Sequence, residues 1–317
     1  MTALGAARPA YAAPLRAVDR YAPADSVDGN RRLVAHKVVS ADDPYMAGHF
    51  PGLIMLPAVF LLEAVRQVVA ADGDWPGRVE LLAVHSIRVR APMRAGDEIR
   101  LDIALRPAES GVRATVHARR QDGIAVAELK ATVGPVTDTV ADQTMPPVPP
   151  LPPATAHGDH ARIRELLPVR HPILLVDRIL AVTPGTEILT AKAVTGSEPC
   201  YGGLPDGLHT DAYAYPRSLA LESFGQSAAL LWLASAADGD VADGVLMVGA
   251  IRDAQFYSAV QPGEVLHHVV RIDNEVGRNA FFTGETWVEN RCVARIGSLI
   301  AASRPALLLA GPRSSSF

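Results

Sequence analysis

The feature that most constrains the fold is a helix motif that occurs twice, once in each half of the chain. The repeated residues are a proline, a glutamate and a glutamine at one spacing: Pro57, Glu63 and Gln67, then Pro216, Glu222 and Gln226. The segment 57–71 is apolar on nearly every face, and such a helix is buried on all sides. The motif therefore predicts two copies of one unit, each built round a central helix.

Other segments repeat in the same order along the chain. Residues 14–20, 41–45 and 90–101 parallel 172–178, 196–200 and 257–266. Residues 88–90, 99–103 and 112–116 alternate apolar and polar side chains, as strands with one solvated face do, and 266–272 and 281–288 are similar. Each half is thus predicted to be α+β, with an antiparallel sheet wrapped round the helix.

A proline-rich stretch at 145–153 separates the halves. Prolines favour an extended chain and cannot donate backbone hydrogen bonds, so the sequence predicts a semi-rigid linker over 136–160. The predicted domains are 1–135 and 161–317. A chain of 317 residues is long enough for two ordinary domains.

The two halves differ in the loop before the helix. Residues 48–52 read Gly-His-Phe-Pro-Gly, whereas counting back from Glu222 by the same spacing reaches Leu208. Two carboxylates and one clearly placed histidine, His49, predict one working site. His209, next to Leu208 in a longer loop, leaves open a second site with Glu63.

Composition narrows the class of protein. The chain is 49% apolar and 20% charged with a formal net charge of -4, which gives no reason to expect nucleic acid or an acidic membrane as partner. The N-terminus lacks the continuous apolar segment of a signal peptide, and the longest apolar run, 227–237, is too short to span a bilayer. A cytoplasmic protein is expected.

Few residues indicate other chemistry. Cys200 and Cys292 are interpreted as ordinary reduced thiols. No group of histidines and acids has metal-ligand spacing, so neither a metal nor a cofactor is expected. Four histidines in strand-like or opening segments are interpreted as structural or solvated: His85, His171, His267 and His268.

Three segments carry a family resemblance. Residues 43–67 resemble the active-site loop and helix of the hot-dog-fold 3-hydroxyacyl-thioester dehydratases, 166–178 resemble that family's opening segment, and 247–264 its strands after the helix. The resemblance implies a double hot-dog: two curved antiparallel sheets, each wrapped round a central helix and joined edge to edge. The tandem halves would form the family's dimer internally as a pseudo-dimer, which leaves further homo-oligomerisation open.

The resemblance also implies roles for residues at the junction. His49 from the first half would face Glu222 from the second. A histidine titrates near neutrality and can act as base, and a carboxyl group in an apolar tunnel tends to keep a proton to donate. Gln226, one helical turn on, would orient Glu222. Backbone N–H groups around Gly52 and Ala58, at the helix start after Pro57, would bind the developing enolate.

The activity implied is dehydration of a 3-hydroxyacyl thioester, carried on acyl carrier protein, in fatty-acid or polyketide synthesis. Alternatives are an enoyl-CoA hydratase, a dehydratase that also isomerises the double bond, a hot-dog thioesterase, and a degenerate acyl-binding or scaffold subunit without activity. Thioesterases of this fold lack the His-Phe-Pro loop. Acyl carrier protein is typically acidic, so basic side chains are candidates for docking: Arg88, Arg90 and Arg94, with Arg217 expected near the tunnel mouth.

Overall fold

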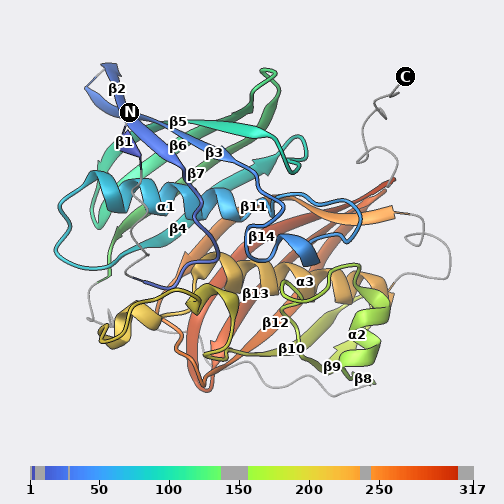
Figure 1. Ribbon diagram of the computed structural model, residues 1–317. Coiled ribbons are helices and arrows are strands. Elements are labelled where there is room, and N and C mark those ends of the chain that lie inside the picture. The colour runs from blue at the N-terminus through green and yellow to red at the C-terminus, as the bar shows by residue number, and fades with distance from the viewer. Residues whose placement is uncertain (1, 4–10, 28, 137–155, 236–243, 306–317) are drawn as a thin grey trace.

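The computed structural model describes residues 2–3, 11–27, 29–136, 156–235 and 244–305. Within them, each half of the chain forms a curved sheet with a helix against its inner face, and the two halves lie one above the other (Figure 1). No helix in these ranges is both long and apolar enough to cross a membrane.

The described residues of the first half form seven strands, one α-helix and one short 3₁₀ helix. In chain order they are β1 (Thr2–Ala3), β2 (Arg20–Val27), β3 (Asn30–Val38), η1 (Met46–Gly48), α1 (Phe60–Asp72), β4 (Val79–Val89), β5 (Glu98–Ala108), β6 (Gly111–Arg120) and β7 (Ala125–Pro135).

The second half repeats this order with additions before and within it. Its elements are β8 (Ala156–Gly158), α2 (His160–Leu166), β9 (Arg178–Thr183), β10 (Glu187–Ala193), η2 (Pro199–Tyr201), η3 (Thr210–Tyr213), α3 (Arg217–Ser235), β11 (Gly244–Phe256), β12 (Val265–Val276), β13 (Asn279–Val288) and β14 (Arg291–Pro305).

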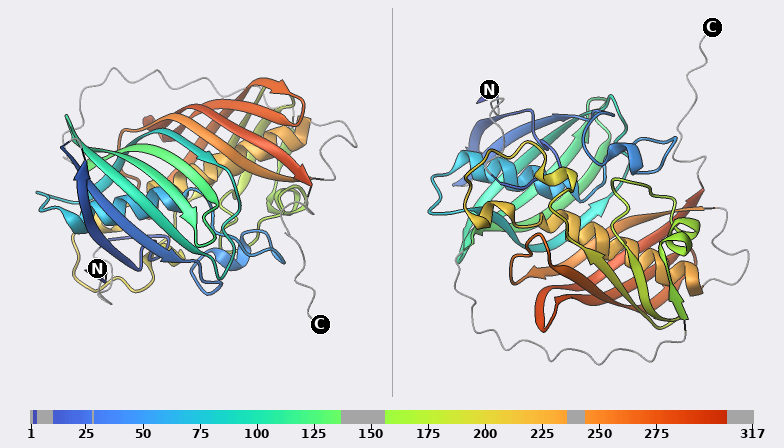
Figure 2. Two further views of the ribbon diagram at one scale, coloured as in Figure 1. Left: turned by 90° about the horizontal axis from the view of Figure 1, so that it is seen from above. Right: turned by 60° about the horizontal axis from the view of Figure 1, so that its bottom comes forward.

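The described strands form one antiparallel sheet of 14 strands. Its order is β1-β2-β3-β5-β6-β7-β4-β11-β14-β13-β12-β10-β9-β8, so the second half mirrors the first about the β4–β11 pair. That pair joins the halves edge to edge, with Ile87 opposite Ile251 and Val84 opposite Ala254. From above, the blue to green strands run on into the orange and red ones (Figure 2). The double hot-dog prediction is confirmed, with the two sheets continuous across the seam.

The central helices are buried as their sequences predict. Every residue of α1 from Phe60 to Val69 is buried, and so are most of those in α3. Each large apolar side chain buried there stabilises the fold by roughly 1.5–3 kcal/mol relative to exposure. The helix start predicted at Pro57 is wrong by three residues: 57–59 form a turn whose carbonyls accept from the N–H groups of 60–62, and α1 begins at Phe60.

Most of the predicted linker, residues 137–155, lies outside the described residues. The end of the range 136–160 does have structure. Strand β8 pairs with β9, and the Asp159 side chain accepts a hydrogen bond from the Arg162 N–H at the start of α2. The last part of the predicted linker thus packs as an edge of the second sheet.

Candidate active site

The loop before α1 holds His49 at the junction of the two halves. The Gly48 carbonyl accepts a hydrogen bond from the Arg170 N–H at 2.9 Å. A Cβ atom on Gly48 would lie 2.1 Å from the Arg170 carbonyl oxygen, so this close approach requires glycine. Gly52 has a φ of +88°, which also favours glycine. The glycines of the loop therefore shape it and allow it to press against the second half.

The His49 ring is held in one tautomer. Its Nδ1 lies 2.7 Å from the Met55 carbonyl oxygen. Because a carbonyl only accepts, Nδ1 carries the hydrogen and Nε2 has a free lone pair. Burial lowers the pKa of His49, while the Glu222 carboxyl group and the Met55 carbonyl act in the opposite direction. The ring is therefore neutral near pH 7 and can accept a proton at Nε2.

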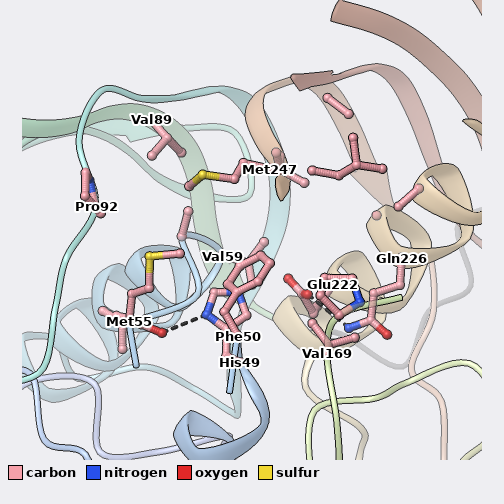
Figure 3. Close-up of a pocket in the computed structure, with 18 of the residues that line it drawn as sticks. His49, Phe50, Met55, Val59, Val89, Pro92, Val169, Glu222, Gln226 and Met247 are labelled. Atoms are coloured by element: carbon pink, nitrogen blue, oxygen red, sulfur yellow. Dashed lines mark hydrogen bonds between the residues drawn. The ribbon is translucent and has the colours of Figure 1, made fainter. Parts of the chain in front are cut away.

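Glu222 reaches the same place from α3. Its Oε1 accepts a hydrogen bond from Gln226 Nε2 at 3.1 Å. The Gln226 amide is fixed in turn, because Nε2 also donates to the Ile173 carbonyl at 2.7 Å and Oε1 accepts from the Leu175 N–H at 2.8 Å. Figure 3 shows His49 and Glu222 approaching each other from ribbons of opposite halves.

These side chains open onto a largely apolar cavity with a volume of about 90 Å³. Residues of both halves line it: His49, Phe50, Met55, Leu56, Ala58, Val59, Val89, Ala91, Pro92, Met93, Leu167, Pro168, Val169, Glu222, Gly225, Gln226, Ala229, Leu246, Met247, Val248 and Ala301. Among the described residues, none accepts a hydrogen bond from the Ala58 N–H, so this donor is available to a ligand. Gly52 and Pro57, which were expected at the substrate site, are not among the residues that line this cavity.

Glu63 is held by Gln67 in the same way as Glu222 is held by Gln226, by a glutamine whose amide is bonded both to the carboxyl group and to the backbone; we call this arrangement the clamp. Gln67 Nε2 donates to Glu63 Oε1 at 2.8 Å and to the Leu15 carbonyl at 2.9 Å, and its Oε1 accepts from the Ala17 N–H at 2.9 Å. The contacts match those of Gln226 with Glu222, Ile173 and Leu175. The duplication therefore extends to individual hydrogen bonds.

The space in front of Glu63 is filled by protein side chains. Arg66 Nε lies 3.1 and 3.2 Å from the two Glu63 oxygens, and its guanidinium carbon lies 4.0 Å from the centre of the Tyr11 ring. Arg66 and Glu63 are each 1% exposed. Burial lowers the pKa of Arg66, but Glu63 and Glu80 more than offset this and leave it raised. Glu63 is therefore one member of a buried ion pair.

Alignment of the two halves shows why the space in front of Glu222 is open and the space in front of Glu63 is filled. Aligning Glu63 with Glu222 sets Arg66 against Gly225 and Arg217 against Ala58. Aligning Leu15 with Ile173, whose carbonyls make the same contact, sets Tyr11 against Val169. Gly225, Ala58 and Val169 all line the open cavity. Large side chains replace each of them at the Glu63 side.

Two sequence-based expectations are corrected here. Arg217 was expected near the tunnel mouth, but it is buried, donates to the Leu81 carbonyl and lies 5.5 Å from the centre of the Phe256 ring. Burial lowers its pKa to about 10, and Arg78 and Arg66 act in the same direction while Glu80 opposes them. The structure also does not bring His209 to Glu63: the His209 side chain is 82% exposed and pairs with Asp211 at 3.1 Å.

Comparison with known proteins agrees with this arrangement. A family model described as ApeI dehydratase matches residues 25–128, and one described as a FabA-like domain matches 167–297. The 3-hydroxyacyl-[acyl-carrier-protein] dehydratase FabZ of Shewanella loihica is 34% identical over 135 residues, which cover 43% of this chain and 86% of the relative. The chain belongs to the hot-dog-fold 3-hydroxyacyl-thioester dehydratase family.

Solved structures of dehydratase domains have a similar fold over at least 90% of this chain. The dehydratase domain from the CurJ module of curacin polyketide synthase matches with a TM-score of 0.62 at 14% identity, covering 93% of this chain and 98% of that domain. The dehydratase domain of RzxB from Pseudomonas fluorescens matches with a TM-score of 0.60 at 16% identity, covering 90% and 98%. At such identities these matches show the double hot-dog fold.

The sequence did not lead us to the residues that leave the Glu222 side open and fill the Glu63 side. Gly225 and Arg66 stand at the same place in the two helix motifs, so the sequence did contain that signal. Tyr11 lies three residues before the aligned segment 14–20, where the pattern alone does not show in which direction a side chain points. Its contact with Arg66 is seen only in the folded structure.

Proposed function

We propose that this chain dehydrates a 3-hydroxyacyl thioester to the trans-2-enoyl thioester at one composite site, using His49 from the first half and Glu222 from the second. The observation that carries the proposal is the meeting of a neutral, tautomer-fixed imidazole and a clamped carboxyl group at one apolar cavity. Membership of a dehydratase family supports the reaction class.

Each residue has one step in the proposed mechanism. His49 Nε2 takes the proton from C2, while the Met55 carbonyl holds Nδ1–H and stabilises the imidazolium that forms. The negative charge moves toward the thioester oxygen, where the free Ala58 N–H can donate. Protonated Glu222 gives its proton to the departing 3-hydroxyl group, which leaves as water. Gln226 keeps the carboxyl group aimed.

The two halves are proposed to act as an intramolecular pseudo-dimer. The units would be 1–135 and 161–317, joined by 136–160, the end of which contributes β8. Support comes from the matching order of the strands about the β4–β11 pair. The composite site then exists in one chain without a second copy.

The assay is turnover of 3-hydroxyacyl thioesters by wild type and by His49→Ala, with mass spectrometry and absorbance of the conjugated product. We expect the trans-2-enoyl thioester from wild type and a loss of roughly 10²–10⁴-fold in the variant. A product with its double bond moved would indicate a dehydratase/isomerase, and free acid would indicate a thioesterase. No turnover with any chain length would favour the degenerate acyl-binding subunit.

Acyl carrier protein is the proposed carrier. Arg88 and Arg90 are exposed at the end of β4, directly before the cavity-lining Ala91 and Pro92, and Arg90 pairs with Glu128 at 3.0 Å. Replacing both arginines by glutamate should raise KM for carrier-bound substrate several-fold and leave KM for a pantetheine thioester unchanged, because charges at a rim act mainly on encounter. A KM for carrier-bound substrate that the double variant leaves unchanged would contradict docking there.

A further inference from the structure

The second half contains a buried polar chain that the mechanism above does not use. His268 on β12 is fully buried, with Nε2 2.8 Å from Ser223 Oγ on α3 and Nδ1 2.9 Å from Thr286 Oγ1 on β13. Ser223 Oγ lies 2.6 Å from the Leu175 carbonyl oxygen. Leu175 is the residue whose N–H holds Gln226.

The direction of each hydrogen bond follows from its acceptors. Ser223 must donate to the Leu175 carbonyl, since a carbonyl cannot donate, and it therefore accepts from His268 Nε2–H. His268 Nδ1 then accepts from the Thr286 hydroxyl group. Burial lowers the pKa of His268 to about 3, and His267 and Lys192 act in the same direction, so the ring stays neutral.

The resulting relay runs in one direction and ends at Glu222. Thr286 donates to His268, His268 to Ser223, and Ser223 to the Leu175 carbonyl. The N–H of Leu175 donates to Gln226, and Gln226 donates to Glu222. The N–H and the carbonyl of Leu175 belong to two different peptide groups, so hydrogen bonds polarise one another on either side of Leu175 but not across it. Across Leu175 the coupling is positional, because both of its backbone polar groups are fixed.

The first half shows that the fold does not need this relay. Leu101 pairs with Ala118 in the sheet as His268 pairs with Thr286, and Ala64 follows Glu63 as Ser223 follows Glu222. All three apolar residues are buried. The Gln67 clamp on Glu63 forms there without any side chain donating to the Ala17 carbonyl among the described residues.

We propose that His268 and Ser223 are positioning residues for Glu222, acting through the backbone of Leu175 and the side chain of Gln226; this rests on the function proposed above. The relay is found in the half that supplies the carboxyl group to the open cavity, and its counterparts are apolar in the half whose glutamate is buried with an arginine. It restricts Leu175 at both its N–H and its carbonyl, whereas Ala17 is held at its N–H.

The main variant replaces the relay by the residues of the first half: Ser223→Ala, His268→Leu and Thr286→Ala together. It leaves no relay side chain unpaired in the core. We expect kcat to fall roughly tenfold or more, because small misplacements of a reacting group have such effects, with KM little changed. The single variant Ser223→Ala should lower kcat in the same direction, should the triple variant not fold.

A matched control removes a different buried hydroxyl pair, Thr190 on β10 with Ser227 on α3, whose oxygens lie 2.7 Å apart. Ser227 donates to the Ser223 backbone carbonyl and not to Leu175. Thr190→Ala with Ser227→Val, again the residue types of the first half, should leave kcat unchanged. His268→Gln, whose amide can donate to Ser223 and accept from Thr286, should retain most of the kcat that the triple variant loses.

Three results would overturn the proposal while wild type remains active: wild-type kcat in the triple variant, an equal loss in the Thr190/Ser227 control, or no recovery with His268→Gln. Absence of wild-type turnover would instead overturn the proposed function. In that case the relay is tested independently of activity, by ¹⁵N NMR of the histidine side chains in ¹⁵N-histidine-labelled protein. It predicts the neutral Nε2–H tautomer of His268 between about pH 5 and pH 8, and any other state in that range contradicts it.

Discussion

Glu222 and Glu63 occupy the same place in duplicated helices, and each is held by a glutamine that grips the backbone in the same way. Glu222 lies at an open cavity facing His49, whereas Glu63 is buried against Arg66. The comparison teaches that the clamp belongs to the duplicated fold. What distinguishes the carboxyl group at the open cavity from the buried one is the size and charge of a few neighbours.

Replacing Gly225 by arginine is expected to have the largest effect on turnover. Gly225→Arg would place a guanidinium beside Glu222, as Arg66 lies beside Glu63. We expect turnover to fall at least about 100-fold, because the carboxyl group would be ion-paired and the cavity filled. Steady-state kinetics would measure this.

Gly225→Ala serves as the control for Gly225→Arg. A Cβ atom there meets Val248 at 3.4 Å and Leu299 at 3.7 Å, which is ordinary contact, so this variant should fold and remain active. Substantial activity in folded Gly225→Arg would break the comparison between the two sides.

The second prediction concerns stability on the filled side. Arg66→Ala removes the partner of Glu63 and one partner of Glu80, leaving buried carboxylates. We expect the free energy of unfolding to fall by about 3–5 kcal/mol, with kcat per folded molecule unchanged. Guanidinium chloride denaturation followed by circular dichroism would measure the first quantity.

A double variant sharpens that stability test. Glu63→Gln with Arg66→Met removes both partners, and Glu80 keeps Arg78 at 2.9 Å. It should lose far less stability than Arg66→Ala. Equal losses for the two variants would mean that packing, and not the buried charge, dominates.

The third and smallest prediction is a pH dependence of the open side. Burial lowers the pKa of His49, so the neutral base persists to lower pH than in a solvated histidine. The acid limb of kcat/KM, where His49 takes up a proton, is therefore expected below the ordinary histidine value of about 6.5. On that limb the rate constant should fall by about tenfold per pH unit. An acid limb centred above that value would contradict the assignment of His49 as base.

Much of the architecture could be predicted from the sequence, because periodic patterns and an internal repeat depend on local residue order. The repeat of the Glu and Gln motif and the strands are examples. The edge-to-edge pairing and the position of His49 opposite Glu222 followed instead from the family resemblance.

The contents of the two sites could not be predicted in the same way. Arg217 begins a helix that points it into the seam, and a single sequence does not show that direction. The sequence indicated no more than a structural or solvated role for His268. Its connection to Ser223 and Leu175 could not be predicted, because it joins three segments distant in the chain. Such contacts depend on tertiary packing.

The most direct test of the central claim compares the two carboxyl groups in one assay. Turnover of a 3-hydroxyacyl thioester would be measured for Glu222→Gln and for Glu63→Gln with Arg66→Met, each corrected for the folded fraction. The account predicts a loss of at least about 10²-fold for the first and wild-type kcat for the second. Loss of about half the activity in the second variant, or retained activity in the first, would contradict a single working site.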